Sequence, residues 1–168
     1  MERLAWNILF TVVEYPELGF KATREVFMRD DGSASSTAHS MQSHPSHPRL
    51  AELISKYPKS ASALFQTFND VTLSHKWTDI QVLELPQCGR GAIKGLRPSL
   101  TAGEPSSTCV VVPCGLAEPI STSWIRDAFA ASDTQLADAP ETLFVAICSG
   151  DSSIVYYKIS KGIIKPQI

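Results

Sequence analysis

The sequence lacks most features that mark secreted, membrane or metal-binding proteins. Only four of its 168 residues are cysteines, and no two of them have the C-x-x-C spacing of a zinc or redox site. We therefore expect free thiols, buried or without a chemical role, in a protein of a reducing compartment; the four cysteines are Cys88, Cys109, Cys114 and Cys148. No apolar run reaches the about 18 residues that a membrane-spanning helix needs, so we expect no insertion into a membrane.

Sequence motifs of enzymes are also missing. No G-x-S-x-G, H-E-x-x-H, phosphate-loop or dinucleotide-binding pattern occurs, and the acidic residues are scattered singly. Gly89-Arg90-Gly91 is too short for a phosphate loop and predicts a turn. His75 is the only histidine outside residues 30–48, and the sequence around it has no recognisable catalytic motif. These absences predict no catalytic, metal or cofactor site.

The composition is that of a globular protein with nearly balanced charge. Hydrophobic residues make up 43% and charged residues 19%, and the formal net charge is -2. A surface that binds nucleic acid throughout is usually strongly basic, so this class is disfavoured. A local basic face stays possible, and its candidates are Lys56, Lys59, Lys76, Arg90, Lys94 and Arg97.

The chain divides into three parts by composition. Residues 1–29 form an N-terminal arm of unknown role, with an apolar run at Leu4 to Val13 that indicates a short helix or a packed arm. Residues 30–47 are rich in serine, proline and histidine, which predicts a flexible linker. The folded domain is expected over residues 48–168.

In the domain we expect first helices, then strands, then one more helix and a final β-hairpin. Apolar spacings of three and four predict helices over 49–57, 60–76 and from Ser121 or Ser123 to Ala131. Extended apolar and β-branched segments predict strands over 80–85, 92–96, 108–112, 142–147 and 154–159. This order predicts a mixed α/β (α+β) protein whose sheet is covered by helices.

The C-terminal end has the most specific pattern. Residues 142–159 read TLFVAICSGDSSIVYYKI, an apolar strand, a short polar turn with one acid and a strand containing Val-Tyr-Tyr-Lys, followed by Gly162 and Pro166. This segment resembles the tail of the small structural subunit of the eukaryotic tRNA-splicing endonuclease, the Sen-fifteen type. Lys76-Trp77, Leu85-Pro86 and the Val-Val-Pro at 111–113 agree in order, so the resemblance covers residues 48–166.

The resemblance implies the fold of tRNA-intron-endonuclease subunits, a mixed sheet flanked by helices with a C-terminal β-hairpin. It implies a heterotetramer of two catalytic and two non-catalytic subunits that cuts precursor tRNA at both ends of the intron. The Sen-fifteen type pairs as a heterodimer with a catalytic subunit of the Sen-thirty-four type. The expected location is the nucleus, with the cytosolic face of the mitochondrial outer membrane as the alternative.

The same resemblance predicts that the chain is not an enzyme. Catalytic relatives use a tyrosine, a histidine and a lysine, and the lysine stands just before the strand equivalent to Leu143 to Ile147. Here Pro140, Glu141 and Thr142 occupy that place. We therefore expect no catalytic residue, no metal and no cofactor.

Two alternatives stay open. One is a self-contained RNA-cleaving enzyme that uses His75 with Tyr156 or Tyr157. The other is a small RNA-binding module that acts without a partner chain.

The last strand is the predicted subunit interface, and it comprises Ile154, Val155, Tyr156, Tyr157, Lys158 and Ile159. Only Lys158 is charged, so we expect the strand to be buried on both faces or paired with a strand of another subunit. A long apolar strand at a sheet edge would otherwise promote aggregation. A central strand of the chain's own sheet is the alternative, and without a partner the strand predicts a homodimer.

The turn before this strand is the predicted contact between the two halves of the complex. It comprises Ser149, Gly150, Asp151, Ser152 and Ser153. In the family, a polar-acidic loop at this place inserts into a basic pocket of a catalytic subunit from the other half. Asp151 is the only carboxylate here, and the alternative is an aspartate that merely holds the hairpin turn.

Overall fold

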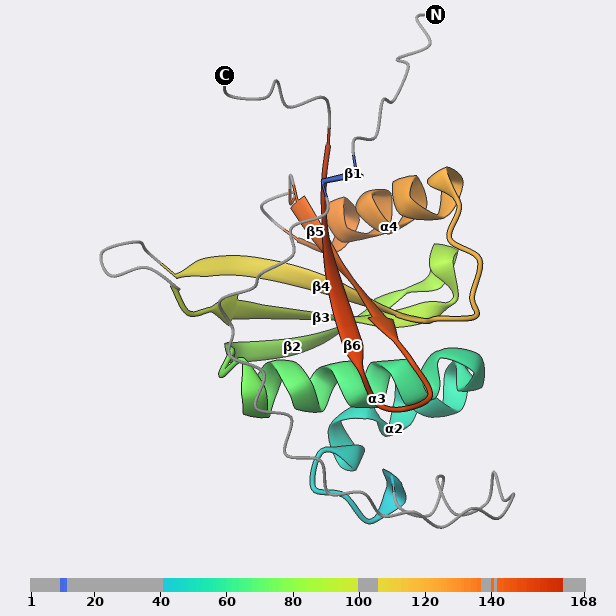
Figure 1. The fold of residues 1–168 in the computed structure, drawn as a ribbon, viewed down its shortest axis with the longest axis vertical. Helices are drawn as coiled ribbons and strands as arrows, with labels where there is room; N and C mark the ends of the chain where they lie inside the picture. The colour runs from blue at the N-terminus through green and yellow to red at the C-terminus, as the bar shows by residue number, and fades with distance from the viewer. Residues whose placement is uncertain (1–9, 12–40, 100–105, 137–139, 141, 162–168) are drawn as a thin grey trace, which may run out of the picture.

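The computed structural model of the chain describes residues 10–11, 41–99, 106–136, 140 and 142–161. Its elements form one sheet with helices on both sides (Figure 1). The strands are β1 (Phe10–Thr11), β2 (Thr78–Leu85), β3 (Arg90–Arg97), β4 (Ser107–Gly115), β5 (Thr142–Cys148) and β6 (Ile154–Ser160). The helices are α2 (His47–Lys56), α3 (Ala61–Asn69), which continues as a π-helical turn η2 (Asp70–Ser74), and α4 (Thr122–Gln135).

The sheet is mixed, with the strand order β1-β6-β5-β4-β3-β2. The pair β4–β5 is parallel because α4 connects these two strands as a crossover, and all other neighbours are antiparallel. This arrangement confirms the predicted mixed α+β class with its C-terminal hairpin. The five predicted strands are all present, and each extends beyond its predicted bounds, most of all β3 and β4.

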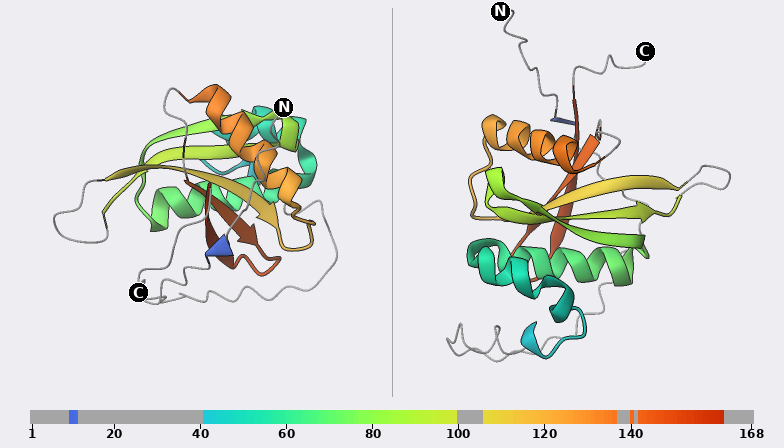
Figure 2. Two further views of the ribbon diagram at one scale, coloured as in Figure 1. Left: turned by 90° about the horizontal axis from the view of Figure 1, so that it is seen from above. Right: turned by 180° about the vertical axis from the view of Figure 1, so that it is seen from behind.

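The two faces of the sheet have separate cores, and Figure 2 shows α4 on one side and α2 with α3 on the other. We call these sides the α4 face and the α3 face. The α4 core contains Val110, Val112, Leu143, Val145 and Ile159 of the strands with Ile125, Ala128 and Phe129 of α4. The α3 core contains Ile93, Val111, Phe144 and Ala146 with Leu50, Leu53, Leu64 and Phe68 of α2 and α3.

Local sequence signals explain where several elements begin. The hydroxyl of Ser121 accepts a hydrogen bond from the backbone N–H of Trp124 at 3.1 Å, which caps α4 as predicted. Pro48 lies in the first turn of α2, where its missing N–H costs no hydrogen bond. Gly89 has a φ of 61° and forms the predicted turn between β2 and β3.

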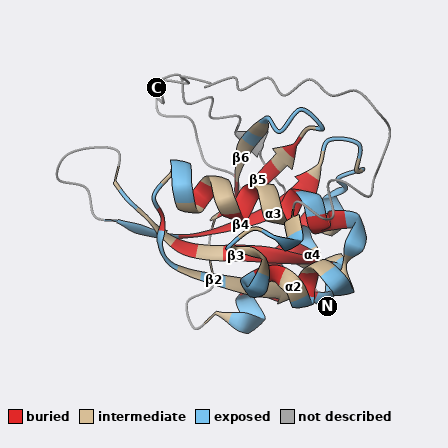
Figure 3. Cartoon of the chain, turned by 90° about the horizontal axis from the view of Figure 1, so that it is seen from below, coloured by how far each residue is buried: buried red, intermediate tan, exposed pale blue. Residues whose placement is uncertain are grey.

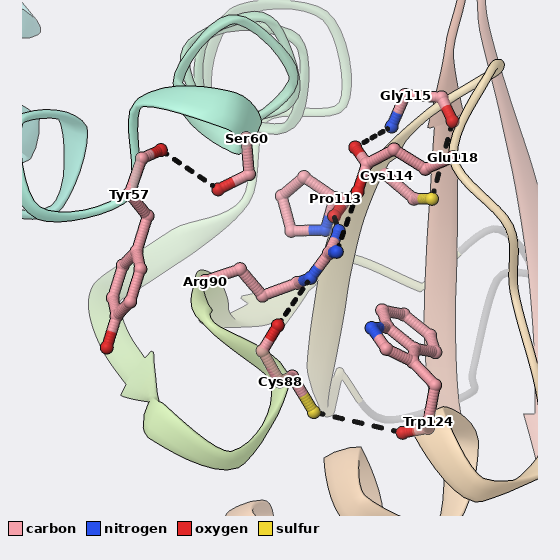
Figure 4. A network of polar contacts seen from close by, with 9 residues as sticks. All are labelled: Tyr57, Ser60, Cys88, Arg90, Pro113, Cys114, Gly115, Glu118 and Trp124. Carbon is pink, nitrogen blue, oxygen red and sulfur yellow. Dashed lines mark hydrogen bonds and ion pairs between the residues drawn. The ribbon is translucent and has the colours of Figure 1, made fainter.

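Arg90, which follows this turn, begins β3 and is buried (Figure 4). Its Nη1 donates to the carbonyl of Pro113 at 2.8 Å, and its Nη2 donates to Glu118 Oε2 at 2.7 Å. The guanidinium carbon lies 4.9 Å from the centre of the Trp124 ring. Glu118 Oε1 accepts from the backbone N–H of Gly115 at 2.7 Å, so this group fastens the connection between β4 and α4.

The end of the predicted linker contacts the domain. The His44 ring packs edge-on against Phe65 with centroids 5.2 Å apart, and the hydroxyl of Ser46 donates to Asn69 Oδ1 at 2.6 Å. The rest of the predicted linker, residues 30–40, and most of the predicted N-terminal arm, residues 1–9 and 12–29, lie outside the described residues. None of the helices in the described ranges has the length and apolar character to cross a membrane.

Candidate subunit interface

The candidate site is the hairpin of β5 and β6, which are paired along their whole length. Thr142 lies opposite Ser160 at one end, and Cys148 lies opposite Ile154 at the other. Figure 3 shows that the turn between these strands is exposed, whereas β5 is largely buried. The hairpin therefore projects its turn into solvent from a strand that is anchored in both cores.

β6 lies near one edge of the sheet. Its only neighbour besides β5 in the described chain is the two-residue strand β1, which pairs with Ile159 and Lys158. Along Ile154 to Tyr157 the outer edge of β6 has no partner among the described residues. Backbone N–H and C=O groups at such an edge are available to a strand from another chain.

The side chains of β6 alternate between the two faces. Val155, Tyr157 and Ile159 share the α4 face, where Ile159 is buried but Val155 is 52% exposed. Ile154 and Tyr156 pack against the α3 core on the other face. Within this chain the strand is therefore not buried on both faces, because α4 covers the end of β6 at Ile159 and leaves Val155 uncovered.

Tyr156 is tied to the far end of the α3 face by a three-residue cluster. Its hydroxyl donates a hydrogen bond to Asp70 Oδ2 at 2.6 Å, and His75 Nε2 lies 3.1 Å from the same oxygen. The rings of His75 and Tyr156 meet edge-on with centroids 5.3 Å apart. The structure thus brings together His75 and Tyr156, the pair considered for RNA cleavage, whereas Tyr157 lies on the opposite face.

The electrostatics of this cluster keep Tyr156 protonated and Asp70 ionised. Burial, and then the negative charge of Asp70, raise the pKa of Tyr156 far above its ordinary value, so the phenol stays protonated and is a poor base. Burial alone would raise the pKa of Asp70. The hydrogen bonds from His75 and Tyr156 outweigh that effect and lower it, so Asp70 is an ionised acceptor that both neighbours share.

The turn residues are held by Asp151. Its Oδ1 accepts hydrogen bonds from the backbone N–H and the hydroxyl of Ser153, at 3.1 and 2.7 Å. These bonds from Ser153 lower the pKa of Asp151, and the residue is exposed. Asp151 therefore holds the turn and also presents a negative charge to solvent, so the two roles considered for it are compatible.

The six basic residues do not form one face. Lys56 pairs with Glu84, Arg90 is buried, and Lys94 lies on the α4 face with its neighbour Ala92. Arg97 lies on the α3 face, where its guanidinium carbon is 5.5 Å from the centre of the Phe144 ring. The described residues include no group of three or more histidine, cysteine or acidic side chains able to hold a metal ion.

Two groups in this region were missed by the sequence reasoning. Asp70 is one of several acids scattered along the chain, and nothing in its sequence context indicates a partner on β6. Nothing in the sequence around Glu118 indicates that its carboxylate forms an ion pair with Arg90. Both pairs join residues far apart in the chain, so no local pattern could have revealed them.

Comparison with known proteins gives a consistent result. The family model described as "Sen15 protein" matches residues 66–168. The chain is 27% identical over 145 residues to the mouse (Mus musculus) protein "tRNA-splicing endonuclease subunit Sen15", covering 83% of each chain. It is 28% identical over 143 residues to the human (Homo sapiens) protein of the same name, covering 82% of this chain and 81% of the relative.

Proposed function

The chain belongs to the Sen15 protein family, and we propose that it serves as a non-catalytic subunit of a tRNA-splicing endonuclease. The mouse and human relatives are named as subunits of that enzyme, and the likeness spans most of each chain. In this role the chain supports cleavage of precursor tRNA at the intron boundaries by binding and orienting a catalytic subunit.

The observation that carries the proposal is the outer edge of β6. Ile154 to Tyr157 have no strand partner on that side among the described residues. One of them, Val155, has a side chain that is 52% exposed. A strand from another subunit would satisfy these backbone groups and would cover the apolar side chains next to them. We therefore propose that the predicted interface strand, Ile154, Val155, Tyr156, Tyr157, Lys158 and Ile159, pairs with another subunit through its open edge at Ile154 to Tyr157, since β1 occupies the edge at Lys158 and Ile159.

The partner we assign to this edge is a catalytic subunit of the Sen-thirty-four type, bound as a heterodimer. The turn Ser149 to Ser153 then contacts a subunit of the second half and completes a heterotetramer. Its exposed carboxylate, Asp151, suits a basic pocket. Without a partner, β6 of two copies would pair in a homodimer. We place the complex in the nucleus.

The absence of catalysis in this chain is part of the proposal. An attack by a ribose hydroxyl needs a base, an acid and stabilisation of the developing charge. The hydroxyl proton of Tyr156 is committed to Asp70, and His75 faces the same carboxylate through Nε2. This cluster supports a structural role, in which η2 fixes the position of the interface strand.

Co-purification tests the assignment. The tagged full chain, isolated from its own cells, should bring a catalytic endonuclease subunit with it, and the mixture should cut intron-containing precursor tRNA. The chain alone should leave that RNA intact. Isolation of the chain without any endonuclease subunit would contradict the proposal, and cleavage by the pure chain that is abolished in His75→Ala would favour the self-contained enzyme.

A further inference from the structure

Two cations flank one aromatic ring on the α3 face of the sheet. Lys158 of β6 lies directly opposite Phe144 of β5, and both residues point to the α3 face by their alternation with Ala146 and Tyr156. From β3, the guanidinium carbon of Arg97 reaches within 5.5 Å of the Phe144 ring centre. Side chains from three strands therefore converge at this point.

The buried ring of Trp77 lies beside this group, and the exposed Lys76 precedes Trp77 in the chain. Trp77 packs so closely on β3 that a Cβ at Gly95 would lie 3.0 Å from its Cε3 atom, and Gly95 stands two residues before Arg97 on the same face. Lys76, which precedes Trp77, has a φ of 55° and is exposed. We call Lys76, Arg97 and Lys158 the cationic face.

The charges of the cationic face are not neutralised within the described chain. Lys56, Arg90, Arg126 and Lys161 each have a carboxylate within ion-pair distance, whereas Lys76, Arg97 and Lys158 have none among the described residues. Arg97 Nε is buried without a hydrogen-bond partner in the same ranges. The acid that lies near Tyr156, Asp70, is occupied by Tyr156 and His75.

This combination has the chemistry of a phosphate-backbone site. The contact with the Phe144 ring restricts the Arg97 side chain before any ligand binds. A guanidinium can donate two parallel hydrogen bonds to two oxygens of one phosphate. Lys158, opposite Phe144 in the sheet, supplies further positive charge, and contacts to the phosphate backbone need only such charges. A solvated surface would need neither the aromatic support nor the convergence from separate strands.

We propose that the cationic face binds the phosphate backbone of RNA, so that this subunit contributes to holding the precursor tRNA as well as the catalytic partner. The inference rests on the proposed function for the identity of the RNA. The cationic face lies on the α3 face of the sheet, whereas the open part of the interface strand presents its backbone edge and, on the α4 face, the side chains of Val155 and Tyr157. Both can therefore be occupied at once.

Binding of an intron-containing precursor tRNA to the full chain tests the proposal, measured as affinity against salt concentration. Arg97→Ala and Lys76→Glu should each weaken binding and lower the salt slope by roughly one unit for every phosphate that the variant no longer neutralises. Lys94→Ala is the matched control, because Lys94 stands on the same strand as Arg97 but on the α4 face. It should leave both the affinity and the slope unchanged.

Folding and assembly are measured on the same variants. Arg97 covers Phe144, so Arg97→Ala is expected to lower the stability of the domain. Lys76 is exposed, so Lys76→Glu tests RNA binding without this effect on the fold. An equal loss of RNA binding in Lys94→Ala, or no change of slope in Lys76→Glu, would overturn the proposal.

Loss of the co-purifying catalytic subunit with unchanged RNA affinity would also overturn it, and would make this face a protein interface. If the chain binds RNA through Arg97 and Lys76 but never co-purifies with endonuclease subunits, the RNA site stands and the proposed function fails.

Discussion

The hydroxyl of Tyr156 on β6 donates a 2.6 Å hydrogen bond to the carboxylate of Asp70, 86 positions earlier in the chain. This bond joins the candidate interface strand to the turn η2 that follows α3. It fixes Tyr156 on the α3 face and thereby directs Val155 and Tyr157 to the other side of the sheet. The two adjacent tyrosines therefore have different roles, one inside the domain and one at its surface.

Tyr156→Phe should destabilise the fold, whereas Tyr157→Phe should not. A hydrogen bond to a charged acceptor contributes about 1.5–3 kcal/mol, and its loss leaves Asp70 with one partner fewer. Tyr157 makes no side-chain hydrogen bond within the described residues, so it is the matched control. Urea unfolding followed by circular dichroism measures both, and equal midpoints would show that the Tyr156–Asp70 bond contributes nothing.

The contribution of Asp70 should depend on pH. Because its pKa is lowered in the folded state, its stabilising effect is present above the ordinary carboxyl pKa and is lost as the pH falls through the folded value. The difference in unfolding free energy between the wild type and Asp70→Asn should therefore be complete above about pH 5 and should shrink as the pH falls below the ordinary carboxyl pKa. The groups facing Asp70 are His75, Tyr156 and Ser74. A difference that grows in this range would contradict the assignment.

Val155→Lys should weaken binding of the catalytic subunit without unfolding the domain. Val155 is 52% exposed beside the open edge of β6, so a lysine there meets only solvent in the free chain but a partner in the complex. Ile120→Lys is the control, since Ile120 is 36% exposed just before α4, whose residue Trp124 contacts Cys88 and Arg90 at the β2–β3 turn, toward the other edge of the sheet. Co-purification yields for the two variants decide between an interface at β6 and one elsewhere.

Tyr157→Ala should have the same effect as Val155→Lys. Truncating an interface aromatic often costs about 2 kcal/mol or more of binding free energy, which corresponds to a loss of at least roughly thirtyfold in affinity. Tyr156→Ala should instead lower the stability of the domain itself, because its hydroxyl and ring pack on η2. A folded Tyr157→Ala variant that keeps full partner affinity would remove Tyr157 from the interface.

Asp151 allows its two roles to be separated by two substitutions. Asp151→Asn keeps an oxygen that accepts the bonds from Ser153 but removes the charge, and Asp151→Lys removes both. If the charge enters a basic pocket, both variants should lose tetramer while keeping the heterodimer, as measured by light scattering of the purified complex. A normal tetramer with Asp151→Asn would limit this residue to holding the turn.

The Arg90 group should be essential for stability. Arg90→Ala removes the donor to Glu118 Oε2 and to the buried carbonyl of Pro113, and we expect a loss of roughly 2 kcal/mol, because a hydrogen bond to a charged group contributes about 1.5–3 kcal/mol and Glu118 keeps its bond from Gly115. Arg126→Ala is the control, since the pair Arg126–Asp127 is exposed and should matter little. Chemical unfolding of both variants measures the difference, and equal stabilities would show that the Arg90 group is dispensable.

The secondary structure was largely encoded locally. The apolar alternation and the polar turn of residues 142–160 specify the β5–β6 hairpin, and Ser121 specifies the start of α4. The sequence of residues 142–159 also showed the resemblance to the Sen-fifteen type. The family match over residues 66–168 agrees with it. These features depend on neighbouring residues, which is why the sequence was sufficient.

Which side chains meet depends on the packing of the whole domain. The sequence could not show that Arg90 is buried against Glu118 or that Tyr156 faces Asp70. Each of these relations joins segments that only the order and register of the strands bring together. Local sequence therefore specified the elements and the family, whereas the packing of the sheet between α4 and α3 set the role of each polar side chain.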